Sequence, residues 1–119
     1  MGASLRLLNI MYTNRMTESV AFYEKLGLFR KVDGEVDKWW NEFPVGNATL
    51  ALHWNEDRPL STESNPELHF QMSPSEFEAV YAEIGDLAPS PVETLEGIGR
   101  FFTVVDPNGV RVQINEEAQ

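Results

Sequence analysis

Amide and imidazole side chains recur at every second position in several segments of the sequence, where they could bind a ligand through hydrogen bonds. Successive side chains of a strand point to opposite faces of its sheet, so each such segment has an apolar face and a polar face. A face that meets only water would carry mainly Lys and Glu, whereas these faces carry few charges. The pattern predicts a small-molecule pocket with a few placed polar groups, with an open, water-facing sheet as the alternative. The expected ligand-binding residues on these faces are Asn9, Met11, Ala51, His53, Glu67, His69, Gln71, Arg111, Gln113 and Asn115.

Aromatic residues indicate the shape of the ligand. Trp39 and Trp40 are adjacent on an expected strand, so one of them faces inward and the other outward. If the residues on either side of the turn 106–109 pair with each other, Phe102 lies opposite Gln113. A planar or amphipathic ligand would then gain roughly 1 kcal/mol per aromatic contact beyond simple burial. The alternative is that both tryptophans pack in a core or a dimer interface.

An internal repeat defines the elements that must position these side chains. The stretch AFYEKLG at 21–27 recurs as AVYAEIG at 79–85, an offset of about half the chain. In both copies apolar residues recur at helical spacing and form one stripe, which needs a sheet to cover. The two halves are therefore expected to be copies of one module.

Each helix has its own start and stop signals. Thr17 is the expected N-cap of the first helix, and Ser73 is that of the second, where Glu76 completes a capping box. Gly27 and Gly85 follow the two helices and are expected to end them.

Strand patterns flank both helices and complete an α+β fold of two βαβββ modules. In the first strand the apolar side chains Leu8, Ile10 and Tyr12 are expected beneath the helix, although the alternation there is weak. The chain is expected to be a single domain, 1–119, with modules at about 4–54 and 67–116 joined by the polar linker 55–66. The expected strands are 6–12, 28–33, 38–45 and 48–54 in the first half, and 67–72, the weakly marked 92–95, 99–105 and 110–116 in the second.

Composition excludes several classes of protein. The 119 residues include no cysteine, so neither a disulfide framework nor a thiolate metal site can form, and the cytoplasm is the default location. A formal net charge of −10 repels phosphate backbones and anionic lipid surfaces, so neither nucleic acid nor membrane is an expected partner. No apolar run approaches the roughly 20 residues of a membrane helix.

Three stretches resemble the vicinal oxygen chelate superfamily, which includes glyoxalase I, extradiol dioxygenases and bleomycin-resistance proteins. These stretches are RLLN near the start, SVAFYEKLGL on the first helix and DPNGVRVQINEE near the end. The resemblance covers nearly the whole chain, and it implies paired βαβββ modules whose sheets curl into a cleft. It also implies a homodimer, which would cover the exposed sheet edges.

The resemblance further implies a set of metal-ligand positions, one on each of four strands. These positions fall on Asn9, Ala51, His69 and Gln113. Of the four residues, only His69 is a good ligand, because Ala51 has no donor atom and neutral amides bind transition metals poorly. His53 is a weak substitute, since it lies about 7 Å further along its strand than Ala51.

This incomplete set of metal ligands leaves two possible functions. The first is a metal-free protein that binds or sequesters a planar or amphipathic small molecule, resembling the bleomycin-resistance branch and needing no cofactor. The alternative is a lyase, isomerase or dioxygenase of the glyoxalase kind, with His53 and His69 in a modified divalent-metal site. Catalytic residues are not identified, although Glu67 or His69 could serve as a general base.

Overall fold

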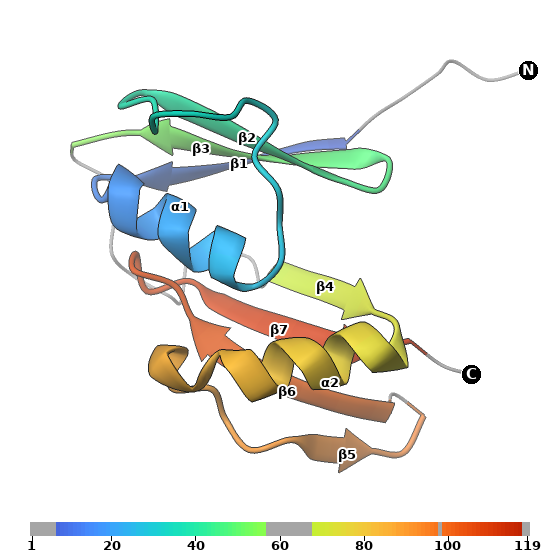
Figure 1. Cartoon of the computed structure of the whole chain (residues 1–119). Coiled ribbons are helices and arrows are strands. Elements are labelled where there is room, and N and C mark those ends of the chain that lie inside the picture. Colours follow the sequence, from blue (N-terminus) through green and yellow to red (C-terminus); the bar gives the residue numbers. More distant parts are fainter. Residues whose placement is uncertain (1–6, 57–67, 98, 118–119) are drawn as a thin grey trace, which may run out of the picture. The chain divides into compact units, whose positions relative to one another are not determined.

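The chain divides into two compact units, Met1–Pro59 and Leu60–Gln119, and each unit combines helical segments with one open, mixed sheet (Figure 1). A computed structural model describes residues 7–56, 68–97 and 99–117. The boundary between the units falls within the expected linker 55–66, most of which lies outside the described residues. No helix in these described ranges is long and apolar enough to cross a membrane.

The first unit has β3 at the centre of a three-stranded sheet. β1 runs parallel to β3 and β2 runs antiparallel to it. One face of this sheet is covered by α1, whose predicted stripe of Val20, Tyr23 and Leu26 is fully buried. The ring of Tyr23 lies 6.1 Å from that of Phe43 on β2, which anchors the helix to the sheet. The elements are β1 (Leu7–Thr13), α1 (Met16–Lys25), β2 (Trp40–Val45) and β3 (Ala48–Trp54).

The expected strand 28–33 does not form, so the first module has two strands after its helix instead of three. The backbone N–H of Lys31 donates to the carbonyl of Glu42 on β2 (2.8 Å), which is the start of a pairing. The chain then turns away at Gly34, whose φ of 100° suits glycine. The guanidinium of Arg30 holds the Gly34 carbonyl at 2.6 Å and fixes this turn.

β1 presents its two faces in the opposite sense to the prediction. Asn9 and Met11 pair with the buried leucines of β3, on the face that α1 covers. Thr13 lies on the same side of β1, and its hydroxyl is 2.9 Å from that of Ser19 on α1. The prediction failed because β1 carries apolar side chains on both faces, so alternation could not decide between them. The open face receives Leu8, Ile10 and Tyr12 instead.

The end of α1 follows the prediction, whereas its start does not. Arg15 is the N-cap and makes no side-chain cap, while the hydroxyl of Thr13 accepts the backbone N–H of Arg15 (2.9 Å). Thr17 therefore lies inside the first turn. At the other end Gly27 adopts a φ of 109° and donates to the carbonyl of Glu24 (3.0 Å), as a left-handed helix stop does.

The second unit contains a four-stranded sheet in the order β4-β7-β6-β5. β4 runs parallel to β7, and the other neighbours are antiparallel. The predicted sequence of strand, helix and three strands is confirmed in this half. The elements are β4 (Leu68–Met72), α2 (Pro74–Glu83), the short 3-10 helix η1 (Gly85–Leu87), β5 (Glu93–Leu95), β6 (Gly99–Val105) and β7 (Arg111–Glu116).

Helix α2 begins as the sequence predicts and ends differently. The hydroxyl of Ser73 accepts the backbone N–H of Glu76 (3.3 Å), and the Glu76 carboxylate accepts that of Ser73 (3.3 Å), which completes the capping box. Gly85 does not act as a left-handed stop, because η1 begins at this residue. The left-handed position comes later, at Ala88, with a φ of 53°.

We expect Ala88→Gly to raise the free energy of unfolding by about 0.5 kcal/mol, because a left-handed conformation strains alanine more than glycine's extra unfolded-state entropy costs. Urea denaturation followed by circular dichroism measures the change. Ala82→Gly, on the exposed side of α2, is the matched control and should destabilise by about 0.5–1 kcal/mol. Equal losses in both variants would contradict the assignment of strain to Ala88.

The turn between β6 and β7 is asymmetric. The backbone N–H of Asp106 donates to the carbonyl of Val110 (2.9 Å), and that of Gly109 donates to the carbonyl of Asp106 (3.0 Å). Gly109 has a φ of 83°, so the loop is a turn followed by a left-handed residue. This geometry makes Asp106, and not the preceding valine, the partner of Val110, and the predicted register is wrong by one residue.

The shifted register moves Phe102 from the open face of the sheet to the helix-covered face. Phe102 pairs with Ile114 and is fully buried, with its ring 5.2 Å from Phe77 and 5.0 Å from Tyr81 of α2. Phe102 is therefore a core residue and is not available to a ligand on the open face. Thr103 takes the place opposite Gln113.

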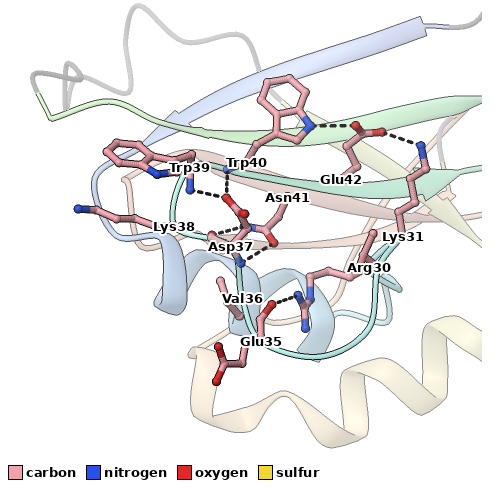
Figure 2. Close-up of a pocket in the computed structure, with 11 residues that line it drawn as sticks. Arg30, Lys31, Glu35, Val36, Asp37, Lys38, Trp39, Trp40, Asn41 and Glu42 are labelled. Atoms are coloured by element: carbon pink, nitrogen blue, oxygen red, sulfur yellow. Dashed lines mark hydrogen bonds and ion pairs between the residues drawn. The ribbon is translucent and has the colours of Figure 1, made fainter.

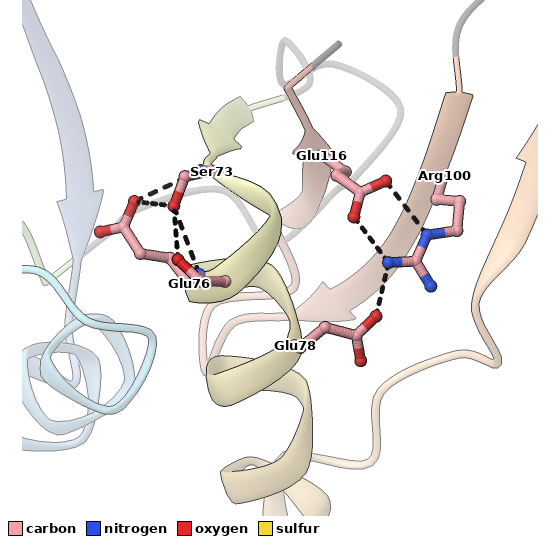
Figure 3. A network of polar contacts seen from close by, with 6 residues as sticks. Ser73, Glu76, Glu78, Arg100 and Glu116 are labelled. Carbon is pink, nitrogen blue, oxygen red and sulfur yellow. Dashed lines mark hydrogen bonds and ion pairs between the residues drawn. The ribbon is translucent and has the colours of Figure 1, made fainter. Parts of the chain in front are cut away.

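A polar network joins α2 to the sheet of the second unit (Figure 3). The guanidinium of Arg100 donates to both carboxylate oxygens of Glu116 (3.1 and 2.6 Å) and to Glu78 of α2 (2.5 Å). It also lies 5.0 Å from the centre of the Phe77 ring. Hydrogen bonds from Arg100 lower the pKa of Glu116, and those to Glu116 and Glu78 raise the pKa of Arg100.

This network should make the second unit sensitive to acid. Because the pKa of Glu116 is lower in the folded state than its ordinary value of 4.5, its contribution to stability is present above pH 4.5 and is lost as the pH falls through the folded value. Glu116→Gln should therefore weaken the dependence of the urea midpoint on pH below 4.5. Glu83→Gln, on the exposed surface of α2, should leave it unchanged. Identical acid profiles for the Glu116 variant and the parent would contradict this account.

Candidate functional site

A chain of hydrogen bonds crosses the open face of the second sheet. The side-chain N–H of Gln113 donates to the Asn115 carbonyl oxygen (2.9 Å), and the Asn115 amide nitrogen lies 3.3 Å from Nδ1 of His69. His69 and Gln113 are direct partners across β4 and β7, so the predicted proximity of these two residues within one sheet is observed. Since an amide nitrogen only donates, Nδ1 accepts, and the ring proton of a neutral His69 lies on Nε2.

Other predicted residues share this face. Gln71 pairs with Asn115, and Arg111 precedes Gln113 by two positions on β7, so both side chains project on the same side as the hydrogen-bonded chain. Gln71 and Arg111 are exposed. Glu67 lies outside the described residues.

The open face of the first sheet carries a row of three rings. Tyr12, His53 and Trp40 are partners across the three strands, and the His53 ring lies 5.4 Å from Tyr12 and 5.5 Å from Trp40. Beside them, the indole N–H of Trp40 donates to Glu42 (2.8 Å). Ala51 lies in the next row of the same face and is completely buried, so its side chain is not available to contact a ligand.

A pocket of about 650 Å³ lies between the loop after α1 and strand β2 (Figure 2). Its volume is within the usual range for sites that bind drug-sized molecules. Trp39 and Trp40 both line it, although they lie on different sides of the chain: Trp40 meets His53, and Trp39 meets the Trp54 ring at 5.3 Å. The full lining is Arg30, Lys31, Val32, Glu35, Val36, Asp37, Lys38, Trp39, Trp40, Asn41 and Glu42.

Side chains hold the loop that frames this pocket at both ends. Near its start, Arg30 binds the carbonyls of residues 34 and 35 (2.6 and 3.2 Å). Near its end, the buried amide of Asn41 donates to the carbonyl of Asp37 (2.8 Å), and its oxygen faces the Asp37 N–H at 3.3 Å. The Asp37 carboxylate also accepts the backbone N–H of Trp39 (2.8 Å) and that of Trp40 (3.1 Å), as Figure 2 shows. The loop that frames the pocket is thus held by contacts within the first unit.

Sequence reasoning missed several residues of these surfaces and misplaced others. Asn9 and Met11 face α1, and Phe102 lies in the core, so these three do not belong to an open face. Tyr12 and Glu42 were not predicted to belong to these surfaces. With the correct strand register, the sequence would have placed Tyr12 and Trp40 on either side of His53, which indicates an aromatic surface. The additional open-face residues are Tyr12, Glu42, Phe101 and Thr103.

The residues at the implied metal positions do not fit a divalent transition metal. Asn9 is turned toward α1 and Ala51 has no donor, so His69 and Gln113 remain, and one imidazole with one neutral amide is a poor ligand set. His53 lies in the first unit, where its ring contacts Tyr12 in a tilted arrangement and Trp40 edge to face. Across the described ranges, no group of three His, Cys, Asp or Glu side chains is arranged to hold a metal ion.

Comparison with known proteins identifies the fold. No family model matches the sequence, and no curated protein is similar to it by sequence. Among solved structures, a glyoxalase/dioxygenase from Nostoc punctiforme superposes with a TM-score of 0.73 at 20% identity, covering 94% of this chain and 90% of that one. The chain has the fold of the vicinal oxygen chelate superfamily, as its sequence motifs predicted.

Both functional branches of that fold are represented among the similar structures. A bleomycin-binding protein from Streptomyces verticillus, complexed with copper(II)-bleomycin, has a TM-score of 0.68 at 18% identity, covering 99% of this chain and 100% of that one. Lactoylglutathione lyase from Agrobacterium tumefaciens has a TM-score of 0.65 at 18% identity, covering 98% and 96%. At these identities the likeness concerns the fold, and function must be argued from the side chains.

Proposed function

We propose that this protein binds a planar or amphipathic small molecule without the help of a metal ion and without changing it chemically. The observation that carries the proposal is the framed 650 Å³ pocket with two tryptophans in its wall. The indole of Trp40 is held by its hydrogen bond to Glu42, so a flat ligand can stack on it with little loss of side-chain entropy. The ligand complex of the structurally similar bleomycin-binding protein supports the same class of activity.

The donor chemistry favours binding over catalysis. Imidazole and amide groups on the open face of the second sheet can orient a ligand by hydrogen bonds, but they do not include an activated nucleophile or a strong set of metal ligands. The metal-dependent enzyme therefore remains the alternative outcome of the experiment below. The proposal includes a homodimer in the cytoplasm, acting on a small molecule and not on nucleic acid or membrane.

Tryptophan fluorescence tests the proposal. Protein treated with a chelator is titrated with bleomycin, with ethidium as a flat cation and with anilinonaphthalenesulfonate as a flat anion. We expect at least one of these compounds to quench fluorescence saturably and to be recovered unchanged by mass spectrometry. Trp40→Phe should reduce the quenching and weaken binding several-fold, because phenylalanine offers less stacking area and cannot bind Glu42.

Trp54→Phe is the matched control, since Trp54 is on β3 and does not itself line the pocket; its ring contacts that of Trp39 at 5.3 Å, and phenylalanine keeps an aromatic ring in that place. It should lower the total fluorescence and change the affinity much less than Trp40→Phe does. If none of the three compounds binds, or if a compound is converted during the titration, the proposed function is wrong.

A further inference from the structure

Arg30, Arg100 and Arg111 differ in the partners of their side chains. Arg30 binds Glu24 and two loop carbonyls, and Arg100 binds two glutamates. Both therefore serve to hold the fold. Arg111 on β7 is exposed and has no ion pair within the described part of the chain, although its backbone is fixed in the sheet by pairing with Val105.

The neighbours of Arg111 on the open face are neutral hydrogen-bonding groups. Gln113 follows on the same side of β7, and Thr103 lies opposite Gln113 on β6. Gln113 gives one N–H to Asn115, which fixes the plane of its amide and leaves its second N–H available to another acceptor. A guanidinium, an amide N–H and a hydroxyl on one face form a set of donors suited to an oxyanion.

Charge on the remainder of this face does not cancel Arg111. In the described strands the other ionisable side chains on the face are His69 on β4 and Glu93, which belongs to β5 at the far edge of the sheet. β6 contributes Val105, Thr103 and Phe101, none of which is charged. Val105, which is 57% exposed and pairs with Arg111, places apolar surface beside the donors, whereas Phe101 is buried.

We infer that the open face of the second sheet binds a small aromatic carboxylate, with its oxyanion at Arg111 and Gln113 and its ring against Val105. A planar carboxylate matches the fork of the guanidinium, and a phosphate or sulfate would lack the flat apolar part that this surface accommodates. In a protein with a net charge of −10, an anion needs such a local cation, because the overall field repels it. Asn115 acts as a positioning residue by fixing the Gln113 amide.

This inference rests on the proposed function only in that the protein binds a small organic molecule. Its test uses benzoate as the probe and benzamide as the neutral probe of the same shape. Side-chain ¹⁵N–¹H resonances of Arg111 and Gln113 are followed by NMR during titration of each probe. We expect benzoate to shift both resonances saturably, with a dissociation constant on the order of millimolar, and benzamide to bind at least about tenfold more weakly.

Variants separate the site from general attraction to positive charge. Arg111→Gln should weaken benzoate binding by about tenfold or more. Arg111→Lys keeps the positive charge but loses the two-point hydrogen bonding of the guanidinium, so its affinity for benzoate should lie between those of Arg111→Gln and the parent. Arg15→Gln is the control, because Arg15 is an exposed arginine of the first unit with no amide partner of this kind. Backbone spectra that overlay those of the parent establish that each variant is folded.

Three results would overturn the inference: shifts that rise linearly without saturation, equal binding of benzamide and benzoate, or equal loss in Arg15→Gln and Arg111→Gln. The readout is separate from that of the proposed function. Tryptophan quenching reports the pocket of the first unit, whereas the Arg111 and Gln113 resonances report the second sheet. If benzoate binds while none of the three test compounds quenches tryptophan fluorescence, the inference stands and the proposed binding function of the Trp40 pocket is wrong.

Discussion

Phe102→Ala is expected to lower the free energy of unfolding by about 3–5 kcal/mol, the largest effect of any single change considered for this chain. Phe102 has no exposed surface, and its ring contacts Phe77 and Tyr81 of α2 at 5.2 and 5.0 Å. Truncation removes both contacts and leaves a cavity between the helix and the sheet. Equilibrium urea denaturation, followed by far-UV circular dichroism, measures the loss.

Phe29→Ala is the matched control for Phe102, because the Phe29 side chain is 83% exposed. We expect it to change stability by less than about 0.5 kcal/mol. The comparison also tests the register of β6 and β7. If Phe102 faced the open side of the sheet, as a symmetric turn would require, the two alanine variants would differ little.

Asn41→Ala is expected to cost about 1–3 kcal/mol of stability and to weaken ligand binding in the Trp40 pocket by about tenfold. The Asn41 side chain is buried, with 6% of the residue exposed, and it makes two hydrogen bonds to the backbone of Asp37. Removing it leaves the Asp37 carbonyl without that donor and frees the loop that frames the pocket. The same fluorescence titration used for Trp40 measures the change in affinity.

Asn47→Ala provides the control for this prediction. Asn47 is exposed in the turn between β2 and β3 and does not line the pocket. Both stability and affinity should be nearly unchanged in this variant. An Asn41 variant that loses stability but keeps full affinity would mean that the loop does not depend on Asn41 to frame the pocket.

The helices and most strands were predictable because their signals are local. Ser73 and Glu76 lie three residues apart in the sequence, and the capping box they form needs no tertiary information. The strong alternation of β7 likewise placed Val112 and Ile114 in the core and Gln113 on the open face. Where the pattern was strong and local, the structure agrees with it.

The failures arose where a choice depended on geometry outside the segment. The register of β7 against β6 depends on Gly109, whose left-handed conformation shifts the pairing by one residue. A shift of one residue moves every side chain of β6 to the face opposite the predicted one. β1 is apolar on both sides, so alternation alone did not define its orientation; in the structure the helix-covered side is the one on which Thr13 contacts Ser19. Segment 28–33 has the composition of a strand, yet it forms a loop in which the Arg30 guanidinium binds the Gly34 carbonyl.

Strand alternation also put His69, Gln113 and Asn115 on polar faces, and they were predicted to face a common hollow. The structure adds that their two strands, β4 and β7, are parallel neighbours. The pocket between the loop and β2 was not foreseen, since it depends on side chains that bind backbone carbonyls. Its two tryptophans were singled out by residue type alone.

The affinity of the quenching ligand with and without a chelator is the most direct test of metal-free binding. Protein purified without chelator is first assayed for divalent ions, and the same ligand is then titrated by calorimetry in buffers that do and do not contain EDTA. The account predicts less than one tenth of an equivalent of metal and the same dissociation constant in both buffers, within about twofold. A stoichiometric divalent ion whose removal abolishes binding would contradict it.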